Sequence, residues 1–232
     1  MKFKIALVIA VLMGTASAWS QWAGEGNLAY SNANGNSNTS ALAASLALSK
    51  ETGLWKHSVG LDAAGSTQDD ATTAESYTLD GQTDYSYSVG YYGFGAARYQ
   101  TDRFSGYDSQ ASVAAGAGWH VIASEAATFD AELGAGFRKS ELQGGIGEES
   151  EGVVSLSLIY KRSITETTDI DVSYFTESGG SNRYSEASAS ARVAMSDALG
   201  LRVGYLIRQN SDAPLGSKST DTLTTLGISY KF

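Results

Sequence analysis

Two histidines, His57 and His120, are the side chains of this sequence best suited to acid–base or nucleophilic catalysis near neutral pH. A Ser–His arrangement also needs a third group that orients the imidazole ring. Both histidines stand near the ends of alternating segments, at positions that the alternation places on the inward face. We interpret them as pore-lining or interfacial residues, and we predict no catalytic residue.

Acidic residues gather in the segments expected to be long loops, and they could hold a hard cation. They are Asp69, Asp70, Glu141, Glu148, Glu149 and Glu151. Carboxylates could bind Ca²⁺ or Mg²⁺, or reach lipopolysaccharide through bridging cations, but no EF-hand spacing is present. The alternative is a solvated acidic surface, and we predict no metal or cofactor. The absence of cysteine excludes disulfides, thiolate chemistry and zinc–sulfur sites.

A further set of charged residues recurs at every second position inside apolar segments. In the stretch from Phe129 to Phe137, one face is apolar and the other carries acids. A charge that faces lipid at mid-depth costs ~2–4 kcal/mol, so these residues are expected to face a lumen. The set is Asp62, Asp80, Asp84, Arg98, Asp130, Glu132, Arg138, Asp171, Glu186, Arg192, Arg202 and Arg208. Hairpin register predicts that side chains touch in two pairs, Asp80 with Arg98 and Glu186 with Arg208.

The elements that would position these residues are strands, because the chain alternates with a period of two. About twelve segments approach the ~10-residue length of a membrane-spanning strand. They are 22–31, 39–50, 55–64, 76–87, 91–102, 111–122, 128–139, 152–162, 169–177, 185–195, 199–208 and 220–232. Short connections alternate with longer ones such as 65–75 and 140–151. This predicts an all-β fold: a transmembrane antiparallel up-and-down β-barrel of about twelve strands, with short periplasmic turns and longer extracellular loops.

The spacing of aromatic residues supports the barrel. Tyr77 and Tyr85, like Phe129 and Phe137, stand eight residues apart on one face, and a soluble sandwich would not fix that gap. Eight tilted residues rise about 20 Å, close to the ~25 Å apolar band between aromatic girdles. The expected girdle is Trp22, Tyr30, Trp55, Tyr77, Tyr85, Tyr91, Tyr99, Trp119, Phe129, Phe137, Tyr160, Tyr230 and Phe232.

The beginning of the chain has the pattern of a secretory signal. Lys2 and Lys4 precede a short apolar run and an A-x-A site that ends at Ala18, which predicts a signal peptide over 1–18 and a barrel over 19–232. Removing two lysines from the 16 basic residues leaves 14 against 25 acidic ones, a net charge of −11. Such an acidic chain is a poor nucleic-acid binder. One proline among 232 residues, with 26 glycines, also suits paired strands.

Two stretches resemble a known family. Residues 97–121 read ARYQTDRFSGYDSQASVAAGAGWHV, and residues 34–48 read NGNSNTSALAASLAL. They resemble the family of salt-induced outer-membrane proteins, a YdiY-like domain of unknown function, although Trp119 replaces an expected tyrosine. The resemblance extends over essentially the whole mature chain. It implies an outer-membrane barrel of about this size in a Gram-negative bacterium, and it supplies no activity and no catalytic residues.

Three functions remain open from the sequence. The first is a narrow passive channel for small polar or charged solutes, since twelve strands lie between filled eight-stranded barrels and open porins. Small inward residues are expected to leave room for water there: Gly116, Gly118, Gly134, Gly136, Gly204 and Gly227. The second is a closed structural or envelope-stress barrel that acts through its loops, and the least favoured is a lipid-modifying enzyme. Expected partners are the lipid bilayer, lipopolysaccharide and, through the aromatic C-terminal strand, the barrel-assembly machinery.

Overall fold

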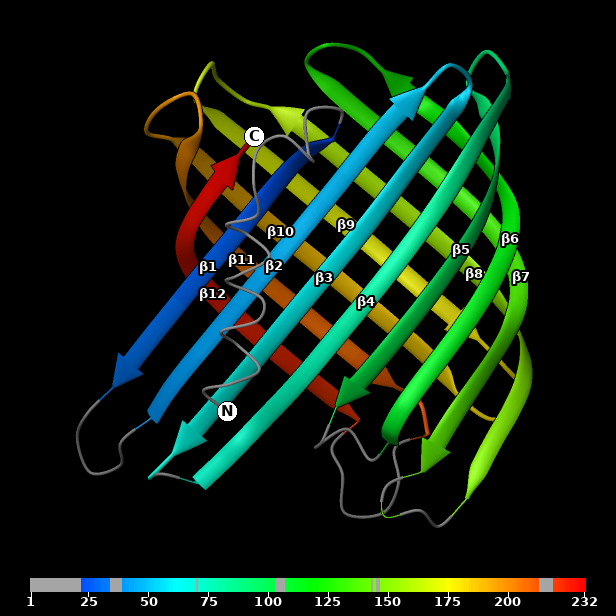
Figure 1. Ribbon diagram of the computed structural model, residues 1–232, viewed down its shortest axis with the longest axis vertical. Coiled ribbons are helices and arrows are strands. Elements are labelled where there is room, and N and C mark those ends of the chain that lie inside the picture. The colour runs from blue at the N-terminus through cyan, green and yellow to red at the C-terminus, as the bar shows by residue number, and fades with distance from the viewer. Residues whose placement is uncertain are drawn as a thin grey trace.

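The structure, a computed structural model, describes residues 22–33, 39–69, 71–102, 107–142, 144, 147–212 and 219–232. The predicted signal peptide 1–18 and the motif residues 103–106 lie outside the described residues. Twelve antiparallel strands pair in chain order, and β12 closes on β1, so the sheet is a closed barrel (Figure 1). The prediction of a twelve-stranded up-and-down barrel is confirmed.

Ten of the twelve strands are longer than the predicted segments; β5 has the predicted bounds, and β12 ends one residue before the predicted end. Their bounds are β1 Ala23–Ala33, β2 Thr39–Thr52, β3 Trp55–Gln68, β4 Ala71–Ser88, β5 Tyr91–Asp102, β6 Tyr107–Ala123, β7 Ala127–Leu142, β8 Glu148–Ser163, β9 Thr168–Ser178, β10 Arg183–Ala194, β11 Leu199–Asn210 and β12 Thr220–Lys231. Within the described residues, no helix is both long and apolar enough to cross a membrane.

The two ends of the barrel differ. The short connections 53–54, 89–90, 124–126, 164–167 and 195–198 lie at one end, here named the turn end, together with the C-terminus (Figure 1). Gly53 and Gly90 take positive φ angles of 62° and 80° in the two-residue turns, a conformation that suits tight hairpins. The remaining connections lie at the opposite end, here named the loop end.

Two of the predicted long loops are wrong. The stretch 65–75 is almost entirely strand: β3 continues to Gln68, β4 starts at Ala71, and a register shift falls between Ser66 and Thr67. The stretch 140–151 is likewise shortened by β7 and β8. These extensions are polar on both faces, so they show no hydrophobic alternation although their backbones are fully paired.

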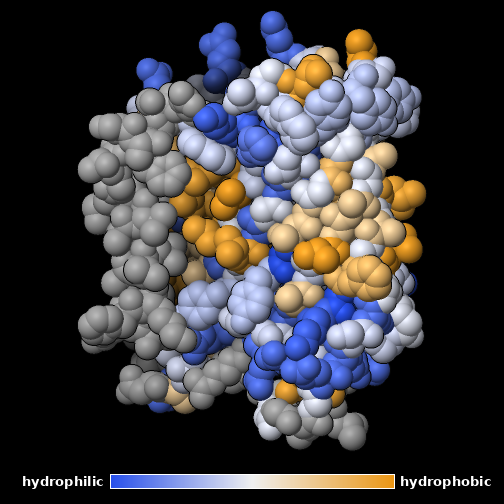
Figure 2. Space-filling model, turned by 45° about the vertical axis from the view of Figure 1, so that its right-hand side comes forward, coloured by the Kyte–Doolittle hydropathy of each residue, from blue (hydrophilic) through white to orange (hydrophobic). Residues whose placement is uncertain are grey.

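The outer surface of the barrel is apolar at mid-height. Leu133 on β7 is 62% exposed and Leu226 on β12 is 68% exposed. On the face seen in Figure 2, apolar side chains gather at mid-height between more hydrophilic zones above and below. A continuous exposed apolar band of this kind is what a barrel presents to lipid, while its charged residues face inward.

Candidate functional site

The inward face is identified by contacts between strands that are not neighbours, since such contacts form only across the interior of a barrel. Arg202 on β11 donates to Asp171 on β9 at 3.1 Å, and Gln82 on β4 donates to Glu132 on β7 at 2.7 Å. Alternation from these residues places all twelve predicted lumen charges on the inward face. They are Asp62, Asp80, Asp84, Arg98, Asp130, Glu132, Arg138, Asp171, Glu186, Arg192, Arg202 and Arg208.

Five of the inward side chains form a bridge across the lumen. Glu186 on β10 accepts hydrogen bonds from Arg98 at 3.0 Å, from Arg208 at 2.9 Å and from the Tyr184 hydroxyl at 2.8 Å. The Arg98 guanidinium also lies 5.4 Å from the ring centroids of both Phe175 and Tyr184. Strands β5 and β10 stand on nearly opposite sides of the barrel. We name Arg98, Phe175, Tyr184, Glu186 and Arg208 the crossbar.

The crossbar contains residues of both predicted pairs, Asp80 with Arg98 and Glu186 with Arg208. The contact between Glu186 and Arg208 is confirmed. Asp80 lies opposite Arg98 on the inward face, as the predicted register requires, but neither a hydrogen bond nor an ion pair joins the side chains of these two described residues. Arg98 reaches across to Glu186 instead, and the Asp80 carboxylate lies over Gly60, where a Cβ would be 2.5 Å from its oxygen.

A second cluster closes one side of the lumen toward the loop end. Arg138 is only 2% exposed and donates to Glu151 at 2.6 Å and to the backbone oxygen of Asn182, with Glu177 at 3.8 Å. The Asn182 side chain in turn donates to Asn210 at 2.9 Å. The cluster draws residues 179–182, between β9 and β10, inward against β7 and β11. Only about 10 Å³ of space remains between it and the crossbar.

Aromatic rings fill the same side nearer the turn end. Tyr92 and Phe94 point inward from β5 and are 3% and 9% exposed. The Tyr92 hydroxyl donates to Glu132 at 2.8 Å. A Cβ at Gly118 would meet the Tyr92 ring, and one at Gly116 would lie 2.8 Å from the Phe94 ring.

The expectation that the inward glycines leave room for water is therefore wrong for most of them. Gly134, like Gly116, is filled by the Phe94 ring, whereas Gly136 and Gly227 face the backbone of a neighbouring strand. Among the six, Gly204 lines open space.

The opposite side of the lumen is open. A cavity of about 240 Å³ lies against β1–β3 and β10–β12 and is lined by small residues such as Ala43, Ala64 and Thr225. A second cavity of about 650 Å³ reaches the turn end, where Glu125 and Lys231 line it. The two cavities share the lining residues Asn27, Ser45, Asp62, Ser188 and Arg202, so they adjoin at mid-depth.

The two histidines lie on opposite faces of the barrel wall. His120 faces the lumen, with its Nδ1 2.6 Å from Asp130. His57 does not: its ring stacks on Trp55, which is 47% exposed on the outer surface, and its Nδ1 lies 3.0 Å from the Thr83 hydroxyl. The inward assignment of His57 is therefore wrong. Among the described residues, no hydrogen bond joins either histidine to a serine, and no group of three or more acids and histidines is placed to hold a metal.

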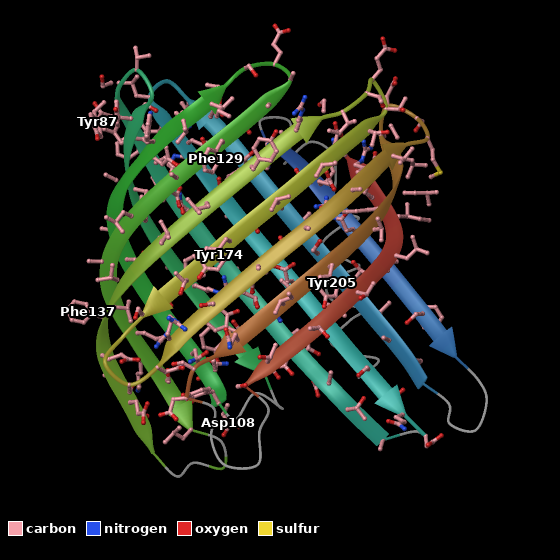
Figure 3. All side chains as sticks on the ribbon, turned by 180° about the vertical axis from the view of Figure 1, so that it is seen from behind. Tyr87, Asp108, Phe129, Phe137, Tyr174 and Tyr205 are labelled. Atoms are coloured by element: carbon pink, nitrogen blue, oxygen red, sulfur yellow. The ribbon has the colours of Figure 1, made fainter. Side chains whose placement is uncertain are left out.

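The outward aromatics form two levels. At the turn end, Trp55 packs on Tyr85 with ring centroids 4.8 Å apart, and Tyr91 stacks on Trp119 at 6.0 Å. In Figure 3, Phe129 lies toward the turn end and Phe137 toward the loop end of β7, where its ring points away from the barrel. Twelve of the thirteen predicted girdle residues occupy outward positions: Tyr30, Trp55, Tyr77, Tyr85, Tyr91, Tyr99, Trp119, Phe129, Phe137, Tyr160, Tyr230 and Phe232. The other, Trp22, precedes the start of β1.

Sequence reasoning missed several of these residues. Tyr174 and Tyr205 are outward and exposed, and alternation with Val172 and Val203 could have found them (Figure 3). Phe175 was missed because an aromatic residue on the inward face carries no signal that separates it from the outward ones.

Comparison with known proteins places the chain in a family. A family model described as "Protein of unknown function, DUF481" matches residues 26–232. The chain belongs to this family. A protein of Escherichia coli (strain K12) named "Uncharacterized protein YdiY" is 27% identical over 228 residues, 96% of this chain and 88% of that protein. The YdiY-like resemblance noted in the sequence is thus confirmed.

Solved structures similar to this DUF481 protein are outer-membrane barrels. The NanC porin has a TM-score of 0.56 at 11% identity, covering 90% of this chain and 100% of the porin. An outer-membrane channel from Pseudomonas putida F1 has a TM-score of 0.55 at 11% identity, covering 91% of this chain and 95% of the channel. At these identities the likeness establishes the fold.

Proposed function

We propose that this DUF481 protein is an outer-membrane channel that lets small polar or charged solutes diffuse through one side of its lumen. The observation that carries the proposal is a pair of adjoining cavities: one of about 240 Å³ along β1–β3 and β10–β12, and one of about 650 Å³ that widens toward the turn end and also reaches β7–β9. Both are lined by hydroxyls, amides and charged groups, which suit hydrated solutes. The similar folds of the NanC porin and the Pseudomonas putida channel agree with this role.

The location follows from the outer surface and the length of the connections. The apolar band between two aromatic levels fits the bilayer of the outer membrane of a Gram-negative bacterium. The turn end would face the periplasm and the loop end the outside, where lipopolysaccharide would meet Phe137 and the neighbouring cation Lys139. The signal peptide over 1–18 would direct export.

The closing strand is the proposed contact with the barrel-assembly machinery. Gly24 and Phe232 exchange backbone hydrogen bonds of 2.9 and 3.0 Å, so the last residue of the chain completes the seam between β12 and β1. The exposed Phe232 ring would be available to the barrel-assembly machinery until the seam between β12 and β1 closes.

At mid-depth the unpaired charges of the open side are acidic and favour cations, although Lys161, also without an ion-pair partner in the described part of the chain, lines the larger cavity nearer the turn end. The Arg202 and Arg208 guanidinium groups are each engaged by a carboxylate, whereas Asp62 and Asp80 face the cavities with no ion-pair partner among the described residues. Passing cations would therefore meet free carboxylates, while passing anions would find these two guanidinium groups already occupied.

The test is single-channel recording in planar bilayers. Ala43→Trp would insert an indole into the 240 Å³ cavity and should roughly halve the current or abolish it, because the open side is narrow. Ala135→Trp adds the same side chain on the outer face of β7 and should leave the current unchanged. Absence of current steps at any salt concentration would refute a channel and favour a closed barrel that acts through its loops, to which the Arg138–Asn182 contacts would then be central.

A further inference from the structure

The two sides of the crossbar are unequal. On one side, Glu186 and Arg208 line the cavity of about 240 Å³. On the other side, Arg98 and Tyr184 line a void of only about 10 Å³. The crossbar therefore separates a cavity that has room for several water molecules from a void that has room for at most about one.

The closed side is packed at the level of the crossbar and toward the loop end, where Arg138 and its partners occupy it. Toward the turn end, the Tyr92 and Phe94 rings fill the part beside β5 and β6, while the 650 Å³ cavity reaches β7–β9. At the level of the crossbar the open side is lined by small inward residues such as Ala43, Ala64 and Thr225. A solute that crosses the lumen at the level of the crossbar must therefore pass beside Glu186 and Arg208.

The crossbar is also held from several directions. Glu186 binds three donors on β5, β10 and β11, and the Arg98 guanidinium lies 5.4 Å from the centroids of two aromatic rings. Arg98 and Glu186 are each about 20% exposed, so water screens their ion pair only in part. A bridge with this many contacts keeps its position while solutes pass.

We infer that the crossbar is the constriction of the channel: it confines permeation to the side of β1–β4, β11 and β12, and the Arg98–Glu186 bridge sets the size limit for the solute. The accepted class is small, unbranched polar solutes and inorganic ions. This inference rests on the proposed channel function and adds the route and the residues that limit its width.

The test compares Arg98→Ser with wild type in planar bilayers, using neutral polyethylene glycols of increasing size to measure the cutoff. Removing the Arg98 side chain leaves Glu186 bound to Arg208 and Tyr184, so the wall is kept while the bridge is broken. Conductance should rise about twofold, and larger polymers should enter. Arg98→Lys keeps a cation of similar reach and should stay near wild type.

Two controls separate the bridge from general damage. Lys139→Ser/Glu148→Ser removes an ion pair of 2.8 Å from the outer surface and should leave conductance and cutoff unchanged. Arg98→Met keeps the packing on Phe175 and Tyr184, so it should give a smaller rise in conductance than Arg98→Ser. It replaces the serine variant if that variant does not fold.

The outcomes distinguish the inference from the function on which it rests. If wild type conducts and neither Arg98→Ser nor Arg98→Met changes conductance or cutoff, the constriction is overturned while the channel stands. If wild type is silent, the open channel is overturned, and current through Arg98→Ser alone would still identify the crossbar as the closure.

Discussion

A cation placed on Leu133 should destabilise the barrel strongly. Leu133 is 62% exposed on the outer face of β7 and stands four residues from both Phe129 and Phe137. At ~3.3 Å per residue and a tilt of ~40°, four residues correspond to about 10 Å along the barrel axis. Leu133→Arg therefore puts a guanidinium near the middle of the apolar band, where it costs ~2–4 kcal/mol.

The cost should fall with distance from that middle. Phe137→Arg lies at the aromatic level of the loop end, and the penalty there is ~0–1 kcal/mol apart from the lost ring. Ala64→Arg adds the same charge inside the 240 Å³ cavity, where water and Asp62 can meet it. It should cost less than Leu133→Arg even though the inserted chain is larger than the alanine it replaces.

The measurement is urea unfolding of protein refolded into phospholipid vesicles, followed by the fluorescence of its tryptophans. The free energy of unfolding should be highest for wild type, lower for Ala64→Arg and lowest for Leu133→Arg. If Leu133→Arg cost no more than Phe137→Arg, the apolar band would not lie in hydrocarbon, and the assignment of inside and outside would lose its physical basis.

Two further predictions concern the interior. Glu186→Gln leaves two guanidinium groups without their carboxylate and should lower the free energy of unfolding by about 2–3 kcal/mol, whereas Lys139→Gln/Glu148→Gln at an exposed pair should lower it by less than ~1 kcal/mol. Gly118→Ala forces a Cβ into the Tyr92 ring and should cost about 1–3 kcal/mol, most of which should vanish in a Tyr92→Ala background. Both are measured by the same urea titration, and additive costs for Gly118 and Tyr92 would contradict the ring contact.

Strand number and facing could be predicted because both depend on local alternation. The segment 91–102 matches β5, Tyr91–Asp102, at both ends, because an apolar outward face and a glycine turn define it. The polar ends of β3 and β4 could not be predicted: beyond the apolar band both faces meet water, so pairing there leaves no pattern in the sequence. His57 was placed on the wrong face because histidine is equally compatible with an aromatic level and with a lumen.

The partners of the inward charges could be predicted only where they sit on adjacent strands. Glu186 and Arg208 face each other in one hairpin, and register alone brings them together. Arg98 and Glu186 are 88 residues apart, and they meet because barrel closure brings β5 and β10 within the reach of two long side chains. No short-range pattern encodes that distance, which depends on the number of strands and their tilt.

The same reasoning explains why small residues alone do not reveal an open lumen. Gly116 and Gly204 are both inward glycines, yet the Phe94 ring of an adjacent strand fills the space beside the first, and a cavity adjoins the second. The deciding factor is the side chain that faces the glycine: β5 carries the inward aromatics Tyr92 and Phe94, whereas Gly204 faces Thr225 on β12. A twelve-stranded wall has enough room for one filled side and one open side, and the Arg98–Glu186 bridge stands at the boundary between them.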